Sequence, residues 1–214
     1  MVNGKKFMEQ DLQSNRKKLF NQENLSIIRQ SFANTVFTHK VQEVAAEFKE
    51  KKIFYIKILN IILVSLVLFL IVLQSFYSNI IFLYFISSVI AIIEIIFLIT
   101  QLTFGLDKQM LMHKNSALKY MGLRDCYRSL IADIMEGNIT NRNLKERRDR
   151  LQHEYQIISE LAPQTGPQEY KETQKRLNKK GVVKGEDFTW SDEEIDRFLP
   201  EDLRLNTNNN NSEL

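Results

Sequence analysis

The chain has 214 residues and a net charge of +3, with its basic residues spread among acidic ones. No basic block interleaved with aromatic residues marks a nucleic-acid surface, so we expect no nucleic-acid partner. The single cysteine, Cys126, excludes an intramolecular disulfide and a thiolate metal cluster. His39, His113 and His153 lack the spacing of metal ligands, and we expect no metal and no other cofactor.

The middle of the chain carries no charge. From Ile58 to Ile93 there are 36 consecutive uncharged positions, whereas both flanks are densely charged. About 20 apolar residues cross a bilayer as a helix, so the apolar run over 53–104 predicts two passes. Ser and Asn in the segment 75–79 favour a turn, which gives spans of about 53–75 and 80–104. The alternative is a hairpin buried in a soluble core, but the remaining residues are too charged to wrap it.

Lysines flank the apolar run on both sides and are missing from its turn. Because basic residues close to a membrane span favour the cytoplasmic side, both termini are predicted to be cytoplasmic. The lysines are Lys49, Lys51, Lys52 and Lys57 before the first span, and Lys108, Lys114 and Lys119 after the second.

Helical periodicity continues on both sides of the hairpin. No Gly or Pro occurs between Lys5 and Thr103, so an amphipathic helix in the N-terminal region 1–52 is predicted to run straight into the first span. The second span is predicted to continue as a long helix into the region 105–180. The predicted fold class is an all-α membrane protein, a two-helix transmembrane hairpin with long amphipathic cytoplasmic helices before and after it. Apolar stripes exceed what one short chain can cover and predict a homo-oligomer; they contain Phe32, Val36, Tyr120, Tyr127 and Ile131.

The rest of the chain is predicted as short helices and linkers. A helix opens at Thr140 and ends before Pro163, and Pro167 starts a short charged helix. In the region 181–214, a linker over 181–185 precedes a capping box that begins at Ser191. Trp190 is a hydrophobic staple or, together with Phe198, an anchor for a partner protein. We expect disorder over 206–214.

Glu94 is the most informative residue for function, since an ionised carboxylate inside a span is costly unless it faces water, a partner or a bundle interior. One interpretation makes it line a cation-tolerant pathway in an oligomer. The other has it neutral, or bonded to Asn60 or a serine, where it holds helices together. The predicted pore-lining or interface face contains Glu94, Ser87, Ala91 and Gln101, with Leu98 and Gly105, on the second span; on the first it contains Asn60 and Gln74, with Lys57, Val64, Val67 and Ile71.

This layout resembles the SLATT family, two-transmembrane effectors named for their association with nucleotide-synthesising and nucleotide-sensing proteins in bacterial defence loci. The resemblance covers roughly residues 20–180. It is carried by the paired spans with almost no outer loop, and by aromatic spacing around the helices predicted after them. The residues concerned are the segment 113–120 from His113 to Tyr120, then Leu123, Tyr127, Tyr155, Ala162, Pro163 and Tyr170. We expect His113, Tyr120, Tyr127 and Tyr155 to pack the cytoplasmic helices together.

The resemblance implies an oligomeric effector of an antiphage, abortive-infection system, resident in the bacterial inner membrane. On activation it would form a pore or disrupt the membrane. Its partners would be membrane lipid, copies of itself, and a nucleotide-signalling, sensor or reverse transcriptase protein from the same locus. The alternative is a non-conducting anchor that recruits a cytoplasmic partner enzyme. A membrane-bound hydrolase would need a nucleophile and a base that the sequence does not show, so we expect no enzyme activity.

Overall fold

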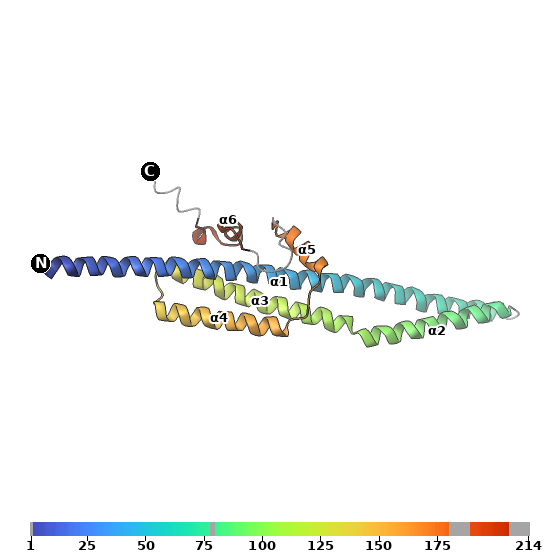
Figure 1. Cartoon of the computed structure of the whole chain (residues 1–214). Coiled ribbons are helices and arrows are strands. Elements are labelled where there is room, and N and C mark those ends of the chain that lie inside the picture. The colour runs from blue at the N-terminus through green and yellow to red at the C-terminus, as the bar shows by residue number, and fades with distance from the viewer. Residues whose placement is uncertain (1, 78–79, 180–188, 206–214) are drawn as a thin grey trace. The chain divides into compact units, whose positions relative to one another are not determined.

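The protein is helical throughout the part that the computed structural model describes, which is residues 2–77, 80–179 and 189–205, with side chains from residue 22 onward. These ranges contain no strand, so the all-α class is confirmed. Two compact units are present: a hairpin unit of residues 43–114 and a head unit of residues 1–42 and 115–214. The elements are α1 Val2–Phe76, α2 Ile81–Phe104, α3 Leu106–Met135, α4 Asn141–Leu161, α5 Pro167–Arg176, α6 Asp192–Asp196 and the 3-10 helix η1 Glu201–Leu203 (Figure 1).

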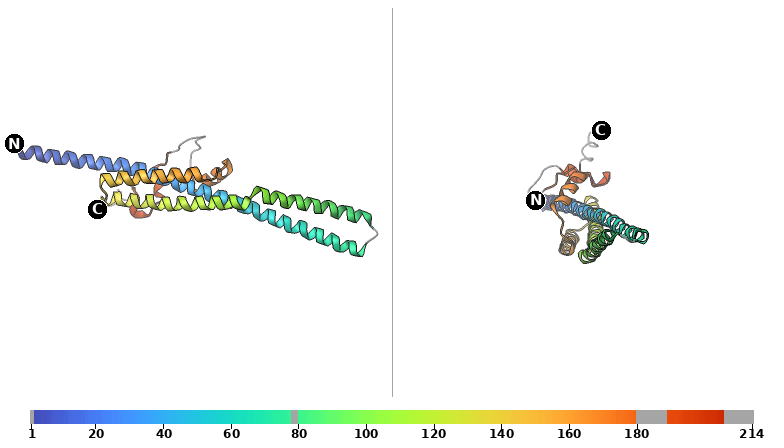
Figure 2. Two further views of the ribbon diagram at one scale, coloured as in Figure 1. Left: turned by 90° about the horizontal axis from the view of Figure 1, so that it is seen from below. Right: turned by 90° about the vertical axis from the view of Figure 1, so that its right-hand side faces the viewer.

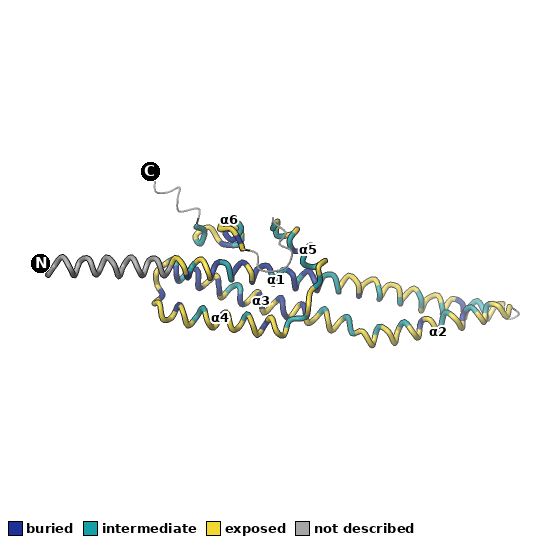
Figure 3. Tube along the Cα trace, viewed as in Figure 1, coloured by how far each residue is buried: buried dark blue, intermediate teal, exposed yellow. Residues whose placement is uncertain are grey.

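The hairpin unit consists of the second part of α1, then α2 and the start of α3. As predicted, α1 contains no break before the first span, and the turn falls between Phe76 and Ile81, although Ser78 and Asn79 lie outside the described residues. Only 6% of the most apolar 18-residue window of the first helix, and 11% of that of the second, is buried. Figure 3 shows most residues of the two helices as exposed or partly exposed. No described segment covers these helices as a soluble core would, and the two fit a two-span membrane protein.

A long helix, α3, follows the second span as predicted, but a break at Gly105 separates it from α2. α2 ends at Phe104 because Gly105 adopts a left-handed conformation, with φ 50° and ψ 41°. Only a residue without Cβ takes this conformation easily, which is why glycine commonly ends helices. Gln109 bridges the break: its backbone N donates to Gly105 O at 3.1 Å, and its side chain donates to Phe104 O at 3.4 Å.

The head unit has a core built by three helices. The α1 stretch before residue 42 lies alongside α3 and α4 in the views of Figures 1 and 2. Residues three and four apart on each helix place their side chains on one face, and these faces meet. The core contains Ile28, Phe32 and Val36 of α1, Tyr120, Leu123, Tyr127, Leu130 and Ile131 of α3, and Leu144, Leu151 and Ile158 of α4.

This core overturns the argument from which we predicted a homo-oligomer. We expected the apolar stripes of the flanking helices to exceed what one chain can cover. Instead they cover one another within the head unit, and each of the stripe residues named above is at most 8% exposed. On α4, Ile157 and Leu161 lie off this core, at 43% and 65% exposed. An oligomer therefore needs a different physical reason.

Local sequence signals set the ends of the shorter helices as predicted. Thr140 caps α4 by accepting from Asn143 N, and Pro167 occupies the first turn of α5. Ser191 and Glu194 form the predicted capping box of α6, each bonding the other's backbone N–H. The predicted linker over 181–185 and the predicted disorder over 206–214 lie outside the described residues.

Candidate functional site

The two helices of the hairpin meet along a seam in which apolar and polar residues alternate. Its members recur every three or four residues, an average of 3.5, which is the repeat of two helices that stay in contact. On α1 they are Ile53, Ile56, Asn60, Leu63, Val67, Leu70 and Gln74; on α2 they are Leu83, Ser87, Ile90, Glu94, Phe97 and Gln101. The polar members of α2 are spaced by seven, so they share one position of the repeat.

A hydrogen bond sets the register of the seam. The Gln74 side chain donates to Ser87 Oγ and, at 3.3 Å, to Leu83 O. Seven residues complete two turns of each helix, and the two helices run in opposite directions. Seven residues before Gln74 on α1 therefore lie opposite seven residues after Ser87 on α2, which places Val67 opposite Glu94. A further step brings Asn60 opposite Gln101. Polar groups thus oppose each other at two layers, while Glu94 opposes a valine.

Glu94 is enclosed in the seam without a partner. It is 7% exposed, and neither carboxylate oxygen has a hydrogen bond to any described residue. The bond to Asn60 or to a serine that we considered is absent there, and Asn60 Oδ1 and Gln101 Nε2 are likewise buried and unpartnered. A charge in such a place is strongly unfavourable.

Part of the predicted polar face points outward instead. Val64, Ile71 and Leu98 are 39%, 51% and 40% exposed, and Lys57 is exposed as well. The prediction included the positions four residues after Asn60, Val67 and Glu94, whereas the helices meet through the positions three residues after them, on the other flank of the same face. Ser87, Glu94 and Gln101 lie on the seam as grouped, and Ala91 lies at its edge, half-buried.

Ionic contacts close the base of the hairpin. Lys57 pairs with Asp107 at 3.6 Å, Lys114 pairs with Glu50 at 3.4 Å, and Lys49 donates to Gln109 at 2.9 Å. A small cavity of about 30 Å³ lies there, with room for a water molecule. Gln101 lines it and Glu94 does not, so the carboxylate lies deeper in the hairpin than this cavity. The lining residues are Ile53, Ile56, Lys57, Gln101, Leu106 and Asp107.

The residues expected to pack helices together are buried or half-buried. Tyr120 and Tyr127 are each 1% exposed, and burial raises the pKa of the Tyr127 hydroxyl to about 12. The Tyr120 and Ser159 hydroxyls lie 2.9 Å apart, and the Tyr120 and Tyr155 rings are 5.6 Å apart. His113 is 3% exposed in the hairpin unit.

Trp190 and Phe198 contact this chain's own core. Trp190 is 3% exposed, and its ring lies 6.0 Å from that of Phe37 and 5.9 Å from that of Phe198. These contacts hold both rings within the chain, and partner docking by these residues stays a prediction that would require their release. The contact that holds this segment, a buried ion pair between Arg29 and Asp196 at 2.5 Å, was not predicted. Nothing in local spacing links residues 167 positions apart.

Two further observations concern metal binding and thiol reactivity. Among the described residues no group of three or more His, Cys, Asp or Glu side chains could hold a metal ion. Cys126 is a free thiol on an exposed part of α3.

Comparison with known proteins gives one match. The family model of the SMODS and SLOG-associating 2TM effector domain, family 4, matches residues 25–194. The matched range includes both apolar helices and most of the head unit. No curated protein and no solved structure matches the chain.

Proposed function

Since this chain belongs to the SMODS and SLOG-associating 2TM effector domain family, we propose that it is an oligomeric membrane effector of a bacterial antiphage, abortive-infection system. On activation it forms a pore in the inner membrane or disrupts that membrane. The observation that carries this proposal is Glu94, an ionisable residue kept inside a two-span hairpin where anchoring alone has no use for it.

The described hairpin corresponds to a closed state in this proposal. Its polar seam faces inward, and its outer surface is apolar enough to contact lipid. Two helices cannot enclose a water-filled lumen, because a lumen needs several walls. Conduction therefore requires several copies whose hairpins open or rotate, so that Glu94 and Gln101 face a shared path. This requirement, rather than exposed stripes on the head unit, is the reason for expecting an oligomer.

Charge substitution at Glu94 tests the pore. Glu94→Gln keeps shape and hydrogen bonding, so we expect unchanged oligomer size but reduced ion leakage and reduced toxicity on overexpression. Glu94→Leu should reduce leakage as well. Leu98→Ala, one turn away on the exposed surface, is the matched control and should leak like the wild type. Membrane depolarisation in cells at matched membrane levels is the measurement, and unchanged leakage in both Glu94 variants would contradict the proposal.

A non-conducting adaptor is the second candidate, and one observation favours it. Glu94 is enclosed within a single hairpin rather than presented on its outer face, as a residue that only packs helices would be. In this case the hairpin anchors the head unit, and the head unit recruits a partner enzyme. Absence of leakage from the activated wild type would favour the adaptor.

Orientation and partner are parts of the same proposal. We propose that both termini are cytoplasmic and that the activating partner is a nucleotide-signalling, sensor or reverse transcriptase protein of the same locus. Cysteines at Ser78 and Asn208 should react with an impermeant thiol reagent from opposite sides of the membrane. The background must carry Cys126→Ser, because Cys126 is exposed. Periplasmic labelling at both positions would exclude this topology, and a biosynthetic operon around the gene would argue against such a partner.

A further inference from the structure

The C-terminal segment 189–205, here the C-terminal clip, is bound to α1 through its backbone as well as its side chains. Gln30 Nε2 donates to Trp190 O at 2.7 Å, and Trp190 N donates to Gln30 Oε1 at 2.9 Å. The indole N–H donates to Asn34 Oδ1 at 2.8 Å. An amide side chain that pairs with both backbone groups of one residue acts as a neighbouring strand would, which is how proteins recognise extended peptides.

A buried ion pair anchors the other half of the clip. Arg29 is fully buried; its guanidinium contacts Asp196 at 2.5 Å and donates to Leu203 O at 3.3 Å. Asp196 in turn accepts from Leu205 N at 3.2 Å. Arg29 Nε has no partner among the described residues. A buried pair with an unsatisfied N–H contributes little net stability, yet removal of one partner is strongly unfavourable. Such a contact suits recognition that has to be reversible.

The clip owes its shape to this docking. Its helices are only five and three residues long, too short to persist alone. Ile195 and Leu199, at 0% and 2% exposed, are buried in the head-unit core. Lys179 fixes the near end, because its ammonium binds Glu194 at 2.7 Å and lies 4.3 Å from the centre of the Trp190 ring.

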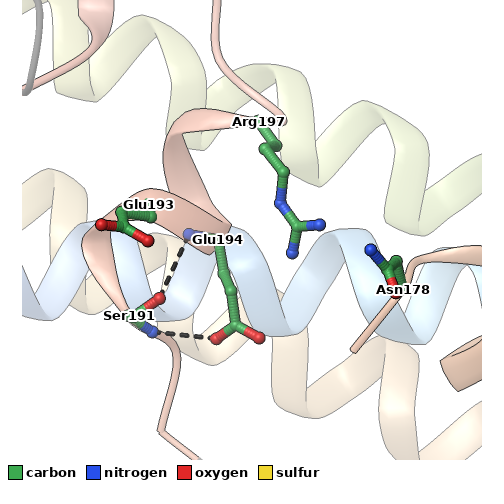
Figure 4. A pocket seen from close by; sticks show the side chains of 5 residues that line it. All are labelled: Asn178, Ser191, Glu193, Glu194 and Arg197. Atoms are coloured by element: carbon green, nitrogen blue, oxygen red, sulfur yellow. Dashed lines mark hydrogen bonds between the residues drawn. The ribbon is translucent and has the colours of Figure 1, made fainter. Parts of the chain in front are cut away.

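The outer side of the clip is open. A depression of about 340 Å³ lies between α6 and the end of α5 (Figure 4). Its lining is polar, and the capping hydrogen bonds between Ser191 and Glu194 lie at its edge. Within the described residues, the clip is therefore held from the α1 side and leaves this depression on its outer side. The lining residues are Asn178, Ser191, Glu193, Glu194 and Arg197.

The family match covers all of one side of this contact and part of the other. Arg29, Gln30, Asn34 and the start of the clip with Trp190 lie inside the matched range 25–194, whereas Asp196 and Leu203 lie beyond it. The docking surface is thus part of the effector domain, and the half of the clip that pairs with Arg29 lies beyond the matched range. From these contacts we infer that the α1 surface of Arg29, Gln30 and Asn34 is a peptide-recognition site whose tethered ligand is the C-terminal clip, and that the docked clip holds the effector inactive.

This inference rests on the proposed function for its inhibitory half and on geometry alone for its recognition half. A competing segment would need the same chemistry: a tryptophan with an accessible backbone, followed six residues later by a carboxylate. Release of the clip exposes Trp190, Ile195 and Leu199 together, and this makes docking measurable.

Trp190 is the sole tryptophan, so its emission in the full-length protein reports docking directly. Asp196→Asn leaves the buried Arg29 with only the exposed carboxylate of Asp192, at 3.4 Å, as a counter-charge and should increase the undocked population roughly a hundredfold. Gln30→Ala is a milder variant that removes only the backbone contacts. Both should shift Trp190 emission to the red, increase quenching by acrylamide and raise depolarisation in cells without a trigger. Arg197→Gln, adjacent in sequence but exposed, is the control and should change neither readout.

The outcomes separate the two proposals. Unchanged emission in both variants, with helix content retained by circular dichroism, would overturn the recognition site. A red shift with basal depolarisation still at the wild-type level would overturn the inhibitory role, while the proposed function stands if the activated wild type depolarises cells. If no variant depolarises cells, and the activated wild type does not either, the proposed function and the inhibitory role are both overturned. The Trp190 emission would still decide whether the recognition site exists.

Discussion

Replacing Glu94 by leucine should make the second span insert more favourably, and the gain should not depend on the first span. On the translocon scale a charged residue at a helix centre is unfavourable by about 2.5 to 3.5 kcal/mol and leucine is favourable by about 0.3 to 0.6. The expected gain is therefore about 3 kcal/mol. The register of the seam places Val67, rather than a polar residue, opposite Glu94, and both carboxylate oxygens lack a partner among the described residues. The presence of α1 should therefore not reduce this gain in insertion free energy.

The assay is the apparent free energy of membrane insertion of α2, measured by glycosylation mapping for residues 81–104 alone and for residues 53–104. Ser87→Ala is the matched control on the same seam. Because Ser87 accepts a hydrogen bond from Gln74 only in the hairpin, its effect should depend on α1 and stay below about 1 kcal/mol. If the Glu94→Leu gain falls by more than about 1 kcal/mol when α1 is present, α1 supplies a partner and the register argument is wrong.

Three further predictions concern stability, each followed by chemical unfolding with Trp190 emission. Phe32→Ala, at a side chain 1% exposed, should reduce the free energy of unfolding by about 3 to 5 kcal/mol, whereas Ile27→Ala, at 52% exposed, should change it by less than about 1. Burial raises the pKa of Tyr127 to about 12, so its contribution to the free energy of unfolding is fully present below about pH 10, the pKa of an unfolded tyrosine. This contribution falls by up to about 2 to 3 kcal/mol as the pH rises to 12. Tyr127→Phe should flatten this fall, and an unchanged pH profile would refute the assignment. Gly105→Ala forces a side chain into φ 50° and should destabilise by about 1 kcal/mol, since the added Cβ meets only Lys108 Cβ at 4.0 Å; no loss would mean that the helix break is not required.

Signals carried by neighbouring residues were sufficient for the helices. The uncharged run to Ile93 predicted both spans, and the capping residues Thr140 and Ser191 predicted where α4 and α6 begin. Such signals are local because a helix satisfies its hydrogen bonds within a few residues. The break at Gly105 was missed because a single glycine is tolerated inside a helix and ends one only where the backbone turns left-handed.

For the candidate site, the sequence identified Glu94 but placed some of its neighbours on the wrong face. Residues three and four positions after a polar residue lie on the two flanks of the same helix face, and the sequence does not state which flank meets the partner helix. Val64, Ile71 and Leu98 therefore seemed to belong to the polar face, although they point outward.

The sequence by itself determined the helical class, the two apolar spans and the presence of an ionisable residue in one of them. These properties follow from the charge and the periodicity of neighbouring residues. Only the tertiary structure decided what those residues face. It packed α1, α3 and α4 into one core within a single chain, buried Glu94 without a hydrogen bond to any described residue, and brought Arg29 to Asp196 across 167 positions. Such long-range contacts follow from how whole faces pack together, and local spacing does not encode them.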